Sequence, residues 1–375
     1  MILVNISNQI GAGPRNISLN FIRAAGTLPQ AEATRFITND DPAILAALQD
    51  AGIRHSVVPL FTRRALKPLR FFYTQFLLVW LTYTNRFDKA LAFGNFFLVG
   101  RARRKGVLLH HPYVVDDELL ARLSGIAHLL ERVKRALFRW TLSRVDVVIV
   151  QSDYMRDMFQ KKYTHYRRQL VVIPNPVSDN FRITQTTTAA ERSAAFGAKT
   201  RFSMIYASRF YPHKNHVFLL DVARAFASRG APVEIVVTLD PAVPGSSDFL
   251  SQAEAEGLAI RNLGEISQTD LSHAYINADA AIFPSRAETF GNPLVEALQF
   301  ALPVVAPRKG YAQAVLGTCG HYYAEDDVED CIATCLALFE DQPHYAEACS
   351  AAQEHGRVFP DANTWCREMF GALDD

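Results

Sequence analysis

Two glutamates flank a glycine turn in the stretch AETFGNPLVEALQF. Gly291 permits a tight turn, Asn292 is a good helix N-cap and Pro293 suits a first helical turn, so we predict a helix that starts near Asn292. Glu288 precedes the turn, and Glu296 lies about one helical turn, roughly 6 Å, into the helix. The unpaired amides and the positive dipole end of such a helix favour a phosphate group.

This arrangement could hold a sugar diphosphate. The two carboxylates would accept hydrogen bonds from the hydroxyls of a sugar on one side and of a ribose on the other. The backbone amides of Phe290 and Gly291 could approach a sugar ring closely, because glycine has no Cβ. An ordinary capped helix with two surface glutamates is the alternative reading, and these residues alone leave it open.

Two cations lie upstream, in the stretch SRFYPHKNHVFLL, where Arg209 and Lys214 precede an apolar run. A departing nucleoside diphosphate accumulates negative charge, and two cations can stabilise that charge without a metal ion. Two basic residues before a helix are usually only exposed. Their interpretation as a phosphate clamp therefore depends on Glu288 and Glu296 downstream.

Together these stretches resemble retaining glycosyltransferase family 4. The family signature E-x-F-G-x-x-x-x-E is matched in register by Glu288, Phe290, Gly291 and Glu296, with Thr289 and Asn292 inside it. The upstream stretch resembles the family's strand, loop and helix that carry the Arg and Lys of the donor clamp. By this resemblance Glu288, Arg209 and Lys214 are catalytic, and the whole motif with both cations binds the donor.

The resemblance covers nearly the whole chain and implies the GT-B fold. It implies transfer of a hexose from a UDP- or GDP-linked sugar, without metal or other cofactor and with retention of the anomeric configuration. The usual proposal is front-face attack in which the departing phosphate oxygen takes the acceptor proton. We therefore name no protein base.

Two motifs in the first half fit the same family. GAGPRN at 11–16 resembles its glycine-rich first loop, which adds Gly11, Gly13 and Arg15 to the expected donor site. LLHHPY at 108–113 resembles its H-D-P strand end. That places His110 on the acceptor side, as a positioning group of the catalytic set, and His111 where an Asp is common.

The sequence also departs from the family. RKGYAQAVLG has Gln313 near the position where a Glu is common, so a donor assignment that depends on that carboxylate is in doubt. The acidic runs DDE at 116 and EDD at 325 lack the strand-flanked D-x-D pattern of metal-dependent transferases.

Short apolar runs alternate with helical segments along the chain, which predicts parallel sheets with helices on both faces. The fold class is α/β, with two Rossmann-like doubly wound domains that face one another across a cleft. We expect an acceptor-binding domain at 1–178, a linker region at 179–200, a nucleotide-sugar domain at 201–354, and a C-terminal helix at 355–375 packed back on the first domain. The strands are expected to begin near residues 2, 33, 55, 89, 106, 146 and 170 in the first half, and near 201, 233, 259, 280, 303 and 320 in the second.

Two helical segments of the first half are unusually apolar. Leu119 to Trp140 is predicted as one helix with a single apolar stripe and basic residues off the stripe, either core-facing or lying on a membrane surface. Leu69 to Tyr83 is interrupted by Arg70 and Gln75 and is too short to span a bilayer.

Charge divides the chain unevenly. Residues 1–182 hold 26 Lys and Arg against 13 Asp and Glu, a net 26 − 13 = +13, and the remainder holds 13 against 25, a net of −12. The basic half indicates an anionic partner, and we favour a membrane surface near a saccharide or glycolipid acceptor over nucleic acid. Five late cysteines without a CxxC pair and the absence of a leader-like start predict a cytoplasmic protein, peripheral on the inner face of the membrane.

Three other functions were weighed. A nucleotide-sugar epimerase of the same fold would also bind a sugar diphosphate, but would need no acceptor. A nucleic-acid-binding protein could use the basic half, although its Arg and Lys form no recognised motif. A dehydrogenase is disfavoured because GAGPRN does not complete G-x-G-x-x-G.

Overall fold

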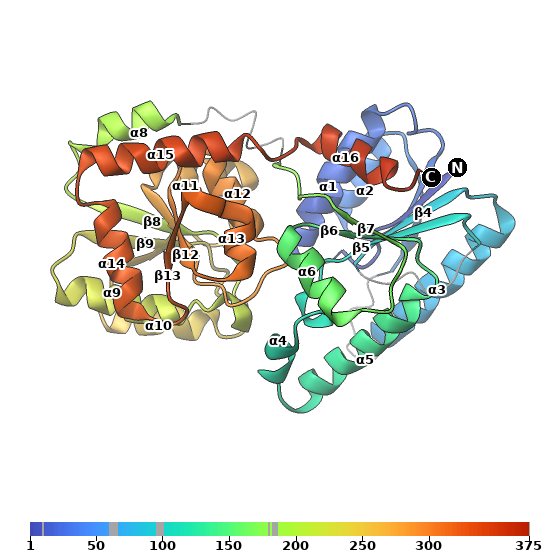
Figure 1. Ribbon diagram of the computed structural model, residues 1–375, viewed down its shortest axis with the longest axis horizontal. Helices are drawn as coiled ribbons and strands as arrows, with labels where there is room; N and C mark the ends of the chain where they lie inside the picture. The colour runs from blue at the N-terminus through green and yellow to red at the C-terminus, as the bar shows by residue number, and fades with distance from the viewer. Residues whose placement is uncertain (10, 60–66, 95–100, 179–180, 182–186, 375) are drawn as a thin grey trace. The chain divides into compact units, whose positions relative to one another are not determined.

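The computed structural model describes residues 1–9, 11–59, 67–94, 101–178, 181 and 187–374 (Figure 1). The chain forms two compact units. The first combines residues 1–176 with 360–375, and the second comprises residues 177–359. Each unit is built on its own parallel sheet.

The first unit contains a seven-stranded sheet in the order β3-β2-β1-β4-β5-β6-β7. All six pairings in it are parallel. The order reverses direction between β1 and β4, which creates a topological switch point at the carboxyl ends of these two strands. The strands are β1 (Ile2–Asn5), β2 (Thr34–Asn39), β3 (Arg54–Val58), β4 (Lys89–Phe93), β5 (Arg104–Leu108), β6 (Val147–Val150) and β7 (Gln169–Val172).

Helices cover both faces of this sheet (Figure 1). Successive strand residues alternate between the faces, so Val4 packs in the cluster formed with α1, α2 and α16, whereas Leu3 packs in the cluster formed with α3, α5 and α6. The helices are α1 (Ala12–Thr27), α2 (Pro42–Asp50), α3 (Lys67–Thr84), α4 (Asp117–Ala121), α5 (Gly125–Leu142), α6 (Asp153–Lys162) and α16 (Ala362–Gly371), with the short η2 (Pro112–Val114).

The second unit repeats the plan with six strands in the order β10-β9-β8-β11-β12-β13, again all parallel. Its switch point lies between β8 and β11. The strands are β8 (Phe202–Tyr206), β9 (Val233–Val237), β10 (Ile260–Asn262), β11 (Ala280–Ile282), β12 (Val304–Pro307) and β13 (Gly320–Tyr323). The helices are α8 (Ala189–Phe196), α9 (Phe218–Ser228), α10 (Ser246–Ala255), α11 (Gln268–Asn277), α12 (Asn292–Gln299), α13 (Gly310–Leu316), α14 (Val328–Leu338) and α15 (Gln342–Gly356), with the short η3 (Pro212–Lys214) and η4 (Gly317–Cys319).

The prediction of two doubly wound parallel sheets is confirmed. Each of the thirteen predicted strands corresponds to an observed strand, displaced by a few residues at most. The apolar runs were long enough to identify the strands because parallel strands are buried on both faces.

The prediction of one helix from Leu119 to Trp140 is wrong. The segment is broken into α4 and α5 at Ser124 and Gly125, where Gly125 has a φ of 56°. Of the two orientations left open for the apolar stripe, the core-facing one does not hold for the part on α5, because Ile126 is 77% exposed and Leu130 is 54% exposed. Amphipathic spacing predicts a helix face, but it does not determine what covers that face.

The segment 179–200, expected to link the domains, contributes a packed helix to the second unit. Helix α8 packs against α15, and Arg192 on α8 is only 5% exposed. Its guanidinium donates to the carbonyl of Phe300 at 2.5 Å, to that of Tyr275 at 2.8 Å, and to that of Ala278. Because a guanidinium can serve several carbonyls at once, this one side chain fastens the segment to the unit.

Residues 355–375, expected as one C-terminal helix on the first domain, are divided between the units. Residues 355 and 356 end α15 in the second unit, whereas α16 packs against α1 in the first. Trp365 on α16 is fully buried, with its ring 5.4 Å edge-on from Phe21.

Helix α3 covers the apolar segment 69–83 and is 18 residues long. Among the described residues, no helix is both long and apolar enough to cross a bilayer. All five cysteines are buried thiols.

We predict that Arg192→Leu destabilises the second unit by about 3 kcal/mol or more, because three buried carbonyls lose a charged donor. Equilibrium urea unfolding measures the loss. The control is Arg201→Leu, which removes an arginine that is 54% exposed and lies 3.5 Å from Glu234. It should change stability by less than about 1 kcal/mol. Equal losses for the two variants would contradict this account of α8.

Candidate active site

The candidate site lies at the switch point of the second unit, where the loops after β8 and β11 leave the same edge of the sheet. Ligands of open parallel sheets bind beyond the carboxyl ends of strands at such a point. The loop after β8 carries Arg209 and Lys214, and the loop after β11 carries Glu288. The topology therefore brings together residues that are 74 positions apart in the sequence.

An ion pair joins the two loops. The Lys214 ammonium lies 2.5 Å from Glu288 Oε1, and the two side chains are only 14% and 12% exposed. The Ser285 hydroxyl donates to the same Glu288 oxygen at 2.7 Å. Tyr206, at the end of β8, donates its hydroxyl to the Lys214 carbonyl at 2.9 Å, which fixes the backbone that presents the ammonium.

Backbone contacts hold the loops in this register. The Arg286 amide donates to the His213 carbonyl at 2.8 Å, and the Arg286 guanidinium pairs with Asp326 at 3.0 Å. Asn215 donates its side-chain amide to the same Asp326 carboxylate at 2.9 Å, and it takes the left-handed conformation with a φ of 56°. These contacts hold the two loops, and with them the Lys214–Glu288 ion pair, in a fixed arrangement.

His216 contacts the backbone of the loop after β8. It is 1% exposed, and burial lowers its pKa to about 3, so the ring is neutral at neutral pH. Its Nε2 lies 3.2 Å from the Ser208 carbonyl, a geometry that requires a proton on Nε2. Neither His216 nor Ser285 is among the site residues predicted from the sequence. Their positions in the sequence could have indicated them, because His216 lies two residues after Lys214 and Ser285 lies three residues before Glu288.

Arg209 differs from Lys214 in its surroundings. Its side chain is exposed, and no hydrogen bond or ion pair joins it to any residue in the described part of the chain. Since Glu288 neutralises Lys214, Arg209 supplies an unbalanced positive charge in this loop.

Helix α12 begins at Asn292, as predicted, but its N-cap is Gly291 and not Asn292. Gly291 has a φ of 87°, and a Cβ there would lie 3.0 Å from Leu294 Cδ1. The positive φ favours glycine at the turn, and a side chain there would also crowd Leu294. Phe290 is buried, with its ring edge-on to Phe359 at 5.9 Å, so its backbone and not its ring is available to a ligand. Thr289 is half-buried beside it.

Glu296 projects from α12 toward α11, where the Tyr275 hydroxyl donates to its Oε2 at 3.0 Å. Burial raises the pKa of Glu296 to about 7, although the Tyr275 hydrogen bond and the Lys214 charge oppose that rise. Both the protonated and the ionised form of the Glu296 carboxyl are therefore populated near neutral pH. Glu288 has a cation as its partner and Glu296 has a phenol.

Gln313, at the point where the motif departs from the family, is exposed on α13. The two acidic runs are used in helix caps and ion pairs. Asp116 caps α4, Asp327 caps α14, and Glu325 pairs with Lys309 at 2.8 Å.

In the first unit the expected glycine-rich loop is shorter than predicted. Helix α1 already begins at Ala12, so Gly13 and Arg15 belong to its first turn and only Gly11 lies in a loop conformation, with a φ of 94°. Nothing lies within 4 Å of a Cβ placed on Gly13. Arg15 approaches Asp41 at 3.8 Å. Pro14 is the third residue of α1, and proline suits a helix start. The stretch GAGPRN therefore fits a helix start as well as the predicted loop.

The two histidines after β5 have different environments. The His110 ring stacks on Phe93 at 6.2 Å, and burial lowers its pKa to about 4, so it is neutral. His111 Nε2 lies 2.6 Å from Glu131 of α5. Burial would raise the pKa of Glu131, but the contacts with His111 and Lys134 outweigh that effect and lower it to about 2. His111 therefore joins β5 to α5.

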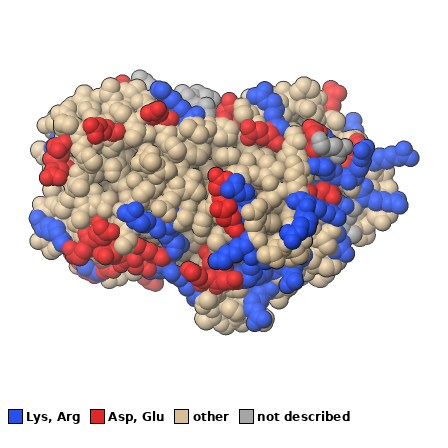
Figure 2. Space-filling model, in the orientation of Figure 1, with Lys and Arg blue, Asp and Glu red and all other residues tan. Residues whose placement is uncertain are grey.

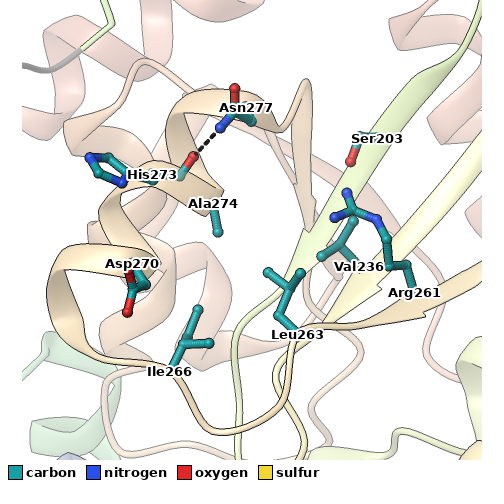
Figure 3. Close-up of a pocket in the computed structure, with 9 residues that line it drawn as sticks. All are labelled: Ser203, Val236, Arg261, Leu263, Ile266, Asp270, His273, Ala274 and Asn277. Atoms are coloured by element: carbon teal, nitrogen blue, oxygen red, sulfur yellow. Dashed lines mark hydrogen bonds between the residues drawn. The ribbon is translucent and has the colours of Figure 1, made fainter.

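A cavity of about 280 Å³ lies between α11 and the sheet of the second unit (Figure 3). Arg261 and Leu263 line one wall, and His273 and Ala274 of α11 line the other (Figure 3). None of the predicted site residues lines this cavity.

Two family models match the chain. The one described as glycosyl transferases group 1 matches residues 201–341, which include the Lys214–Glu288 pair, and the one described as Glycosyltransferase Family 4 matches residues 30–181. The two matches fall on the two halves of the chain.

Curated relatives show the same likeness over parts of their length. The sulfoquinovosyl transferase SQD2 of Arabidopsis thaliana is 33% identical over 96 residues, which are 24% of this chain and 19% of that protein. The gpi3 subunit of a phosphatidylinositol N-acetylglucosaminyltransferase of Schizosaccharomyces pombe is 25% identical over 225 residues, 58% of this chain and 47% of that protein. The chain thus matches less than half the length of these relatives.

Solved structures match over both units. HepE of Anabaena, in complex with UDP and glucose, has 20% identity and a TM-score of 0.70, covering 99% of this chain and 98% of that one. WaaG, a glycosyltransferase involved in lipopolysaccharide biosynthesis, has 16% identity and a TM-score of 0.72, covering 100% and 99%. At these identities the likeness shows the fold.

The raised pKa of Glu296 predicts a pH-dependent stability. The folded state keeps a proton that the unfolded chain releases near pH 4.5, so this contribution is complete below pH 4.5 and is lost as the pH rises through about 7. Glu296→Gln stays neutral at every pH. Its stability relative to the parent chain should therefore rise between about pH 5 and about pH 8, by at most about 3 kcal/mol at about 1.4 kcal/mol per pKa unit. Urea unfolding at several pH values measures the difference. A difference that does not vary with pH would contradict the assignment.

Proposed function

Because this chain belongs to glycosyltransferase family 4 and has the GT-B fold, we propose that it transfers a hexose from a UDP- or GDP-linked sugar to a lipid-linked or membrane-associated saccharide. The acceptor would be of the kind used in assembling bacterial cell-surface polysaccharide or glycolipid. The observation that carries the proposal is the Lys214–Glu288 pair at the switch point of the second unit, beside the exposed Arg209.

The geometry suits a nucleoside diphosphate. An ammonium has three donors, and Glu288 accepts one from Lys214, which leaves two for phosphate oxygens. The pair is neutral overall, so the positive charge that attracts the anion comes from Arg209 and from the amino end of α12. The Lys214 ammonium is held by Glu288 and by the fixed backbone of its loop, so it needs little reorganisation when charge develops on the leaving group.

The proposed reaction retains the anomeric configuration and uses no metal. The bond between the anomeric carbon and the phosphate oxygen breaks, and a bond from the acceptor oxygen to that carbon forms on the same face. The acceptor proton passes to the departing phosphate oxygen, whose negative charge Lys214 and Arg209 stabilise. Neutral His110 would orient the acceptor or the sugar by hydrogen bonding, and it carries no charge to compete with the phosphate.

Glu288 and Glu296 divide the remaining work. Glu288, oriented by Ser285 and Lys214, has acceptor capacity left for sugar hydroxyls. Glu296 accepts from Tyr275 and would receive ribose hydroxyls when ionised. The solved neighbour that holds UDP and glucose supports a donor of this chemistry.

The proposal for the acceptor is based on the charge of the first half of the chain. The first 182 residues carry 26 − 13 = +13, which would attract a phosphate-bearing glycolipid and the anionic membrane around it. We accordingly place the protein on the cytoplasmic face of a membrane as a peripheral enzyme.

Donor binding is the first test. A ligand that binds only the folded state raises its stability, so the matching nucleotide sugar should raise the Tm within a panel of UDP-, GDP-, ADP- and CMP-sugars. Incubating that donor with and without glycolipid acceptor then separates transfer from epimerisation, because an epimerase consumes donor alone. No stabilisation by any UDP- or GDP-sugar would refute the donor assignment.

Lys214→Ala tests the role of the cation in chemistry. We expect kcat to fall about 10²- to 10³-fold with little change in acceptor KM, as for other donors that act on developing charge. Lys199→Ala is the matched control, because Lys199 pairs with Asp279 at the opposite, amino-terminal edge of the same sheet. It should lower stability and leave kcat of the folded enzyme unchanged. A defect of Lys214→Ala confined to acceptor affinity would refute the diphosphate role.

A further inference from the structure

Exposed apolar side chains are concentrated on two helices of the first unit. Among the described residues fifteen large hydrophobic side chains are exposed, and ten of them lie on α3 and α5. Single exposed apolar residues are normal on a protein surface, but contiguous groups mark interaction sites.

Helix α3 has two apolar sides. Leu77, Leu78 and Leu81 pack in the core against the sheet. Phe76 and Trp80 belong to an outer aromatic row with Phe72, Tyr73 and Tyr83, and these five side chains are 44% to 67% exposed. A helix on a protein surface usually presents polar residues outward, so this outer row requires another explanation than folding.

Helix α5 repeats the pattern with aliphatic residues. Its outer row consists of Ile126, Leu129, Leu130, Val133 and Trp140, which are 47% to 77% exposed. Phe138 and Leu142 anchor its other side in the same core cluster as α3. The two helices therefore cover one face of the first sheet (Figure 1), and we call their ten outward side chains the α3–α5 face.

Arginines border the α3–α5 face. A pocket of about 560 Å³ lies at the C-terminal end of α5, lined by Arg139, Trp140 and Tyr166 together with Arg167 and Arg168. Arg168 pairs with Asp146 at 2.8 Å, whereas Arg139 and Arg167 are exposed and have no ion pair with any described residue. Figure 2 shows Lys and Arg crowded over this unit.

Two acidic side chains near α5 contact basic residues. Glu131 on α5 contacts His111 at 2.6 Å and Lys134 at 2.7 Å, and Asp117 pairs with Lys162 at 2.7 Å. The surface around the α3–α5 face thus combines apolar, aromatic and cationic groups, and Glu118 of α4 is an exposed acidic side chain near it.

We propose that the α3–α5 face is the surface through which this chain binds an anionic phospholipid bilayer. The aromatic and aliphatic rows would enter the headgroup region, and the arginines around Trp140 would bind lipid phosphates. Tyr and Trp beside Lys and Arg is the composition of interfacial anchors. A second copy of this face is a poorer partner, because pairing would bring two cationic borders together. The inference rests on the membrane-associated acceptor of the proposed function.

The test compares binding to phosphatidylcholine vesicles with and without phosphatidylglycerol by sedimentation at low and high salt. Phe76→Asn with Leu130→Asn should weaken binding to anionic vesicles at least about tenfold. The double variant loses two apolar side chains that would be buried in the membrane. Arg139→Gln with Arg167→Gln should weaken it about 25-fold at low salt, at roughly fivefold per charge near an anionic surface, and much less at high salt.

Matched controls make the same changes elsewhere. Val57→Asn with Val358→Asn alters exposed apolar residues off the face, and Arg229→Gln with Arg357→Gln removes two exposed charges from the second unit. Both should bind within about twofold of the parent chain. Equal binding to neutral and anionic vesicles, or equal loss in the controls, would overturn the proposal. So would apolar variants that convert a dimer to a monomer without changing vesicle binding.

The Tm shift given by the nucleotide sugar distinguishes the two levels of the argument. Face variants that lose vesicles but keep the donor shift support this surface. A parent chain that binds vesicles through the face and shows no donor shift refutes the proposed function alone. A chain with the donor shift and no preference for anionic vesicles refutes the surface alone.

Discussion

The Lys214–Glu288 pair depends on one topological constraint, the reversal of strand order between β8 and β11. Parallel pairing sends both following loops off the same sheet edge, so a lysine and a glutamate 74 residues apart meet without any local sequence signal. Removing both charges from water is costly, and the attraction between them offsets that cost only with good geometry and added hydrogen bonds. Ser285 and the braced backbone supply those conditions, which explains why so much of the loop structure surrounds this contact.

The two carboxylates of one motif have different partners. Glu288 faces an ammonium, whereas Glu296 faces the phenol of Tyr275. Glu288 is held by the ion pair with Lys214, whereas burial raises the pKa of Glu296 to about 7. The same residue type can therefore serve as a fixed orienting group and as a group whose affinity for hydroxyls responds to pH.

Much of the fold could be predicted from the sequence, because buried parallel strands give continuous apolar runs and the glycine and proline at the start of α12 have specific backbone requirements. The predictions that failed concern side chains whose partners lie far away in the sequence. Nothing in the sequence near Arg192 indicates that three carbonyls from two distant segments surround it. Periodicity predicted the apolar stripe of α5 but not its exposure. The Glu296–Tyr275 contact joins two helices that are 21 positions apart at these residues, and no local pattern predicts it. The extra turn of α1 at Gly13 was missed because glycine-rich sequence is read as loop.

Helix α16 gives the chain an order of assembly during synthesis. Trp365, Met369 and Phe370 fill the same core as β1 and α1, and a Cβ on Gly106 of β5 would lie 2.6 Å from Leu373. The second unit is thus an insertion within the first, which must wait for its own last helix. As the chain emerges from the ribosome, residues 177–359 can complete their core before the part made earliest does. The usual amino-terminal-first order of domain folding would then be reversed, because the part of the first core that α16 fills cannot form before α16 is made.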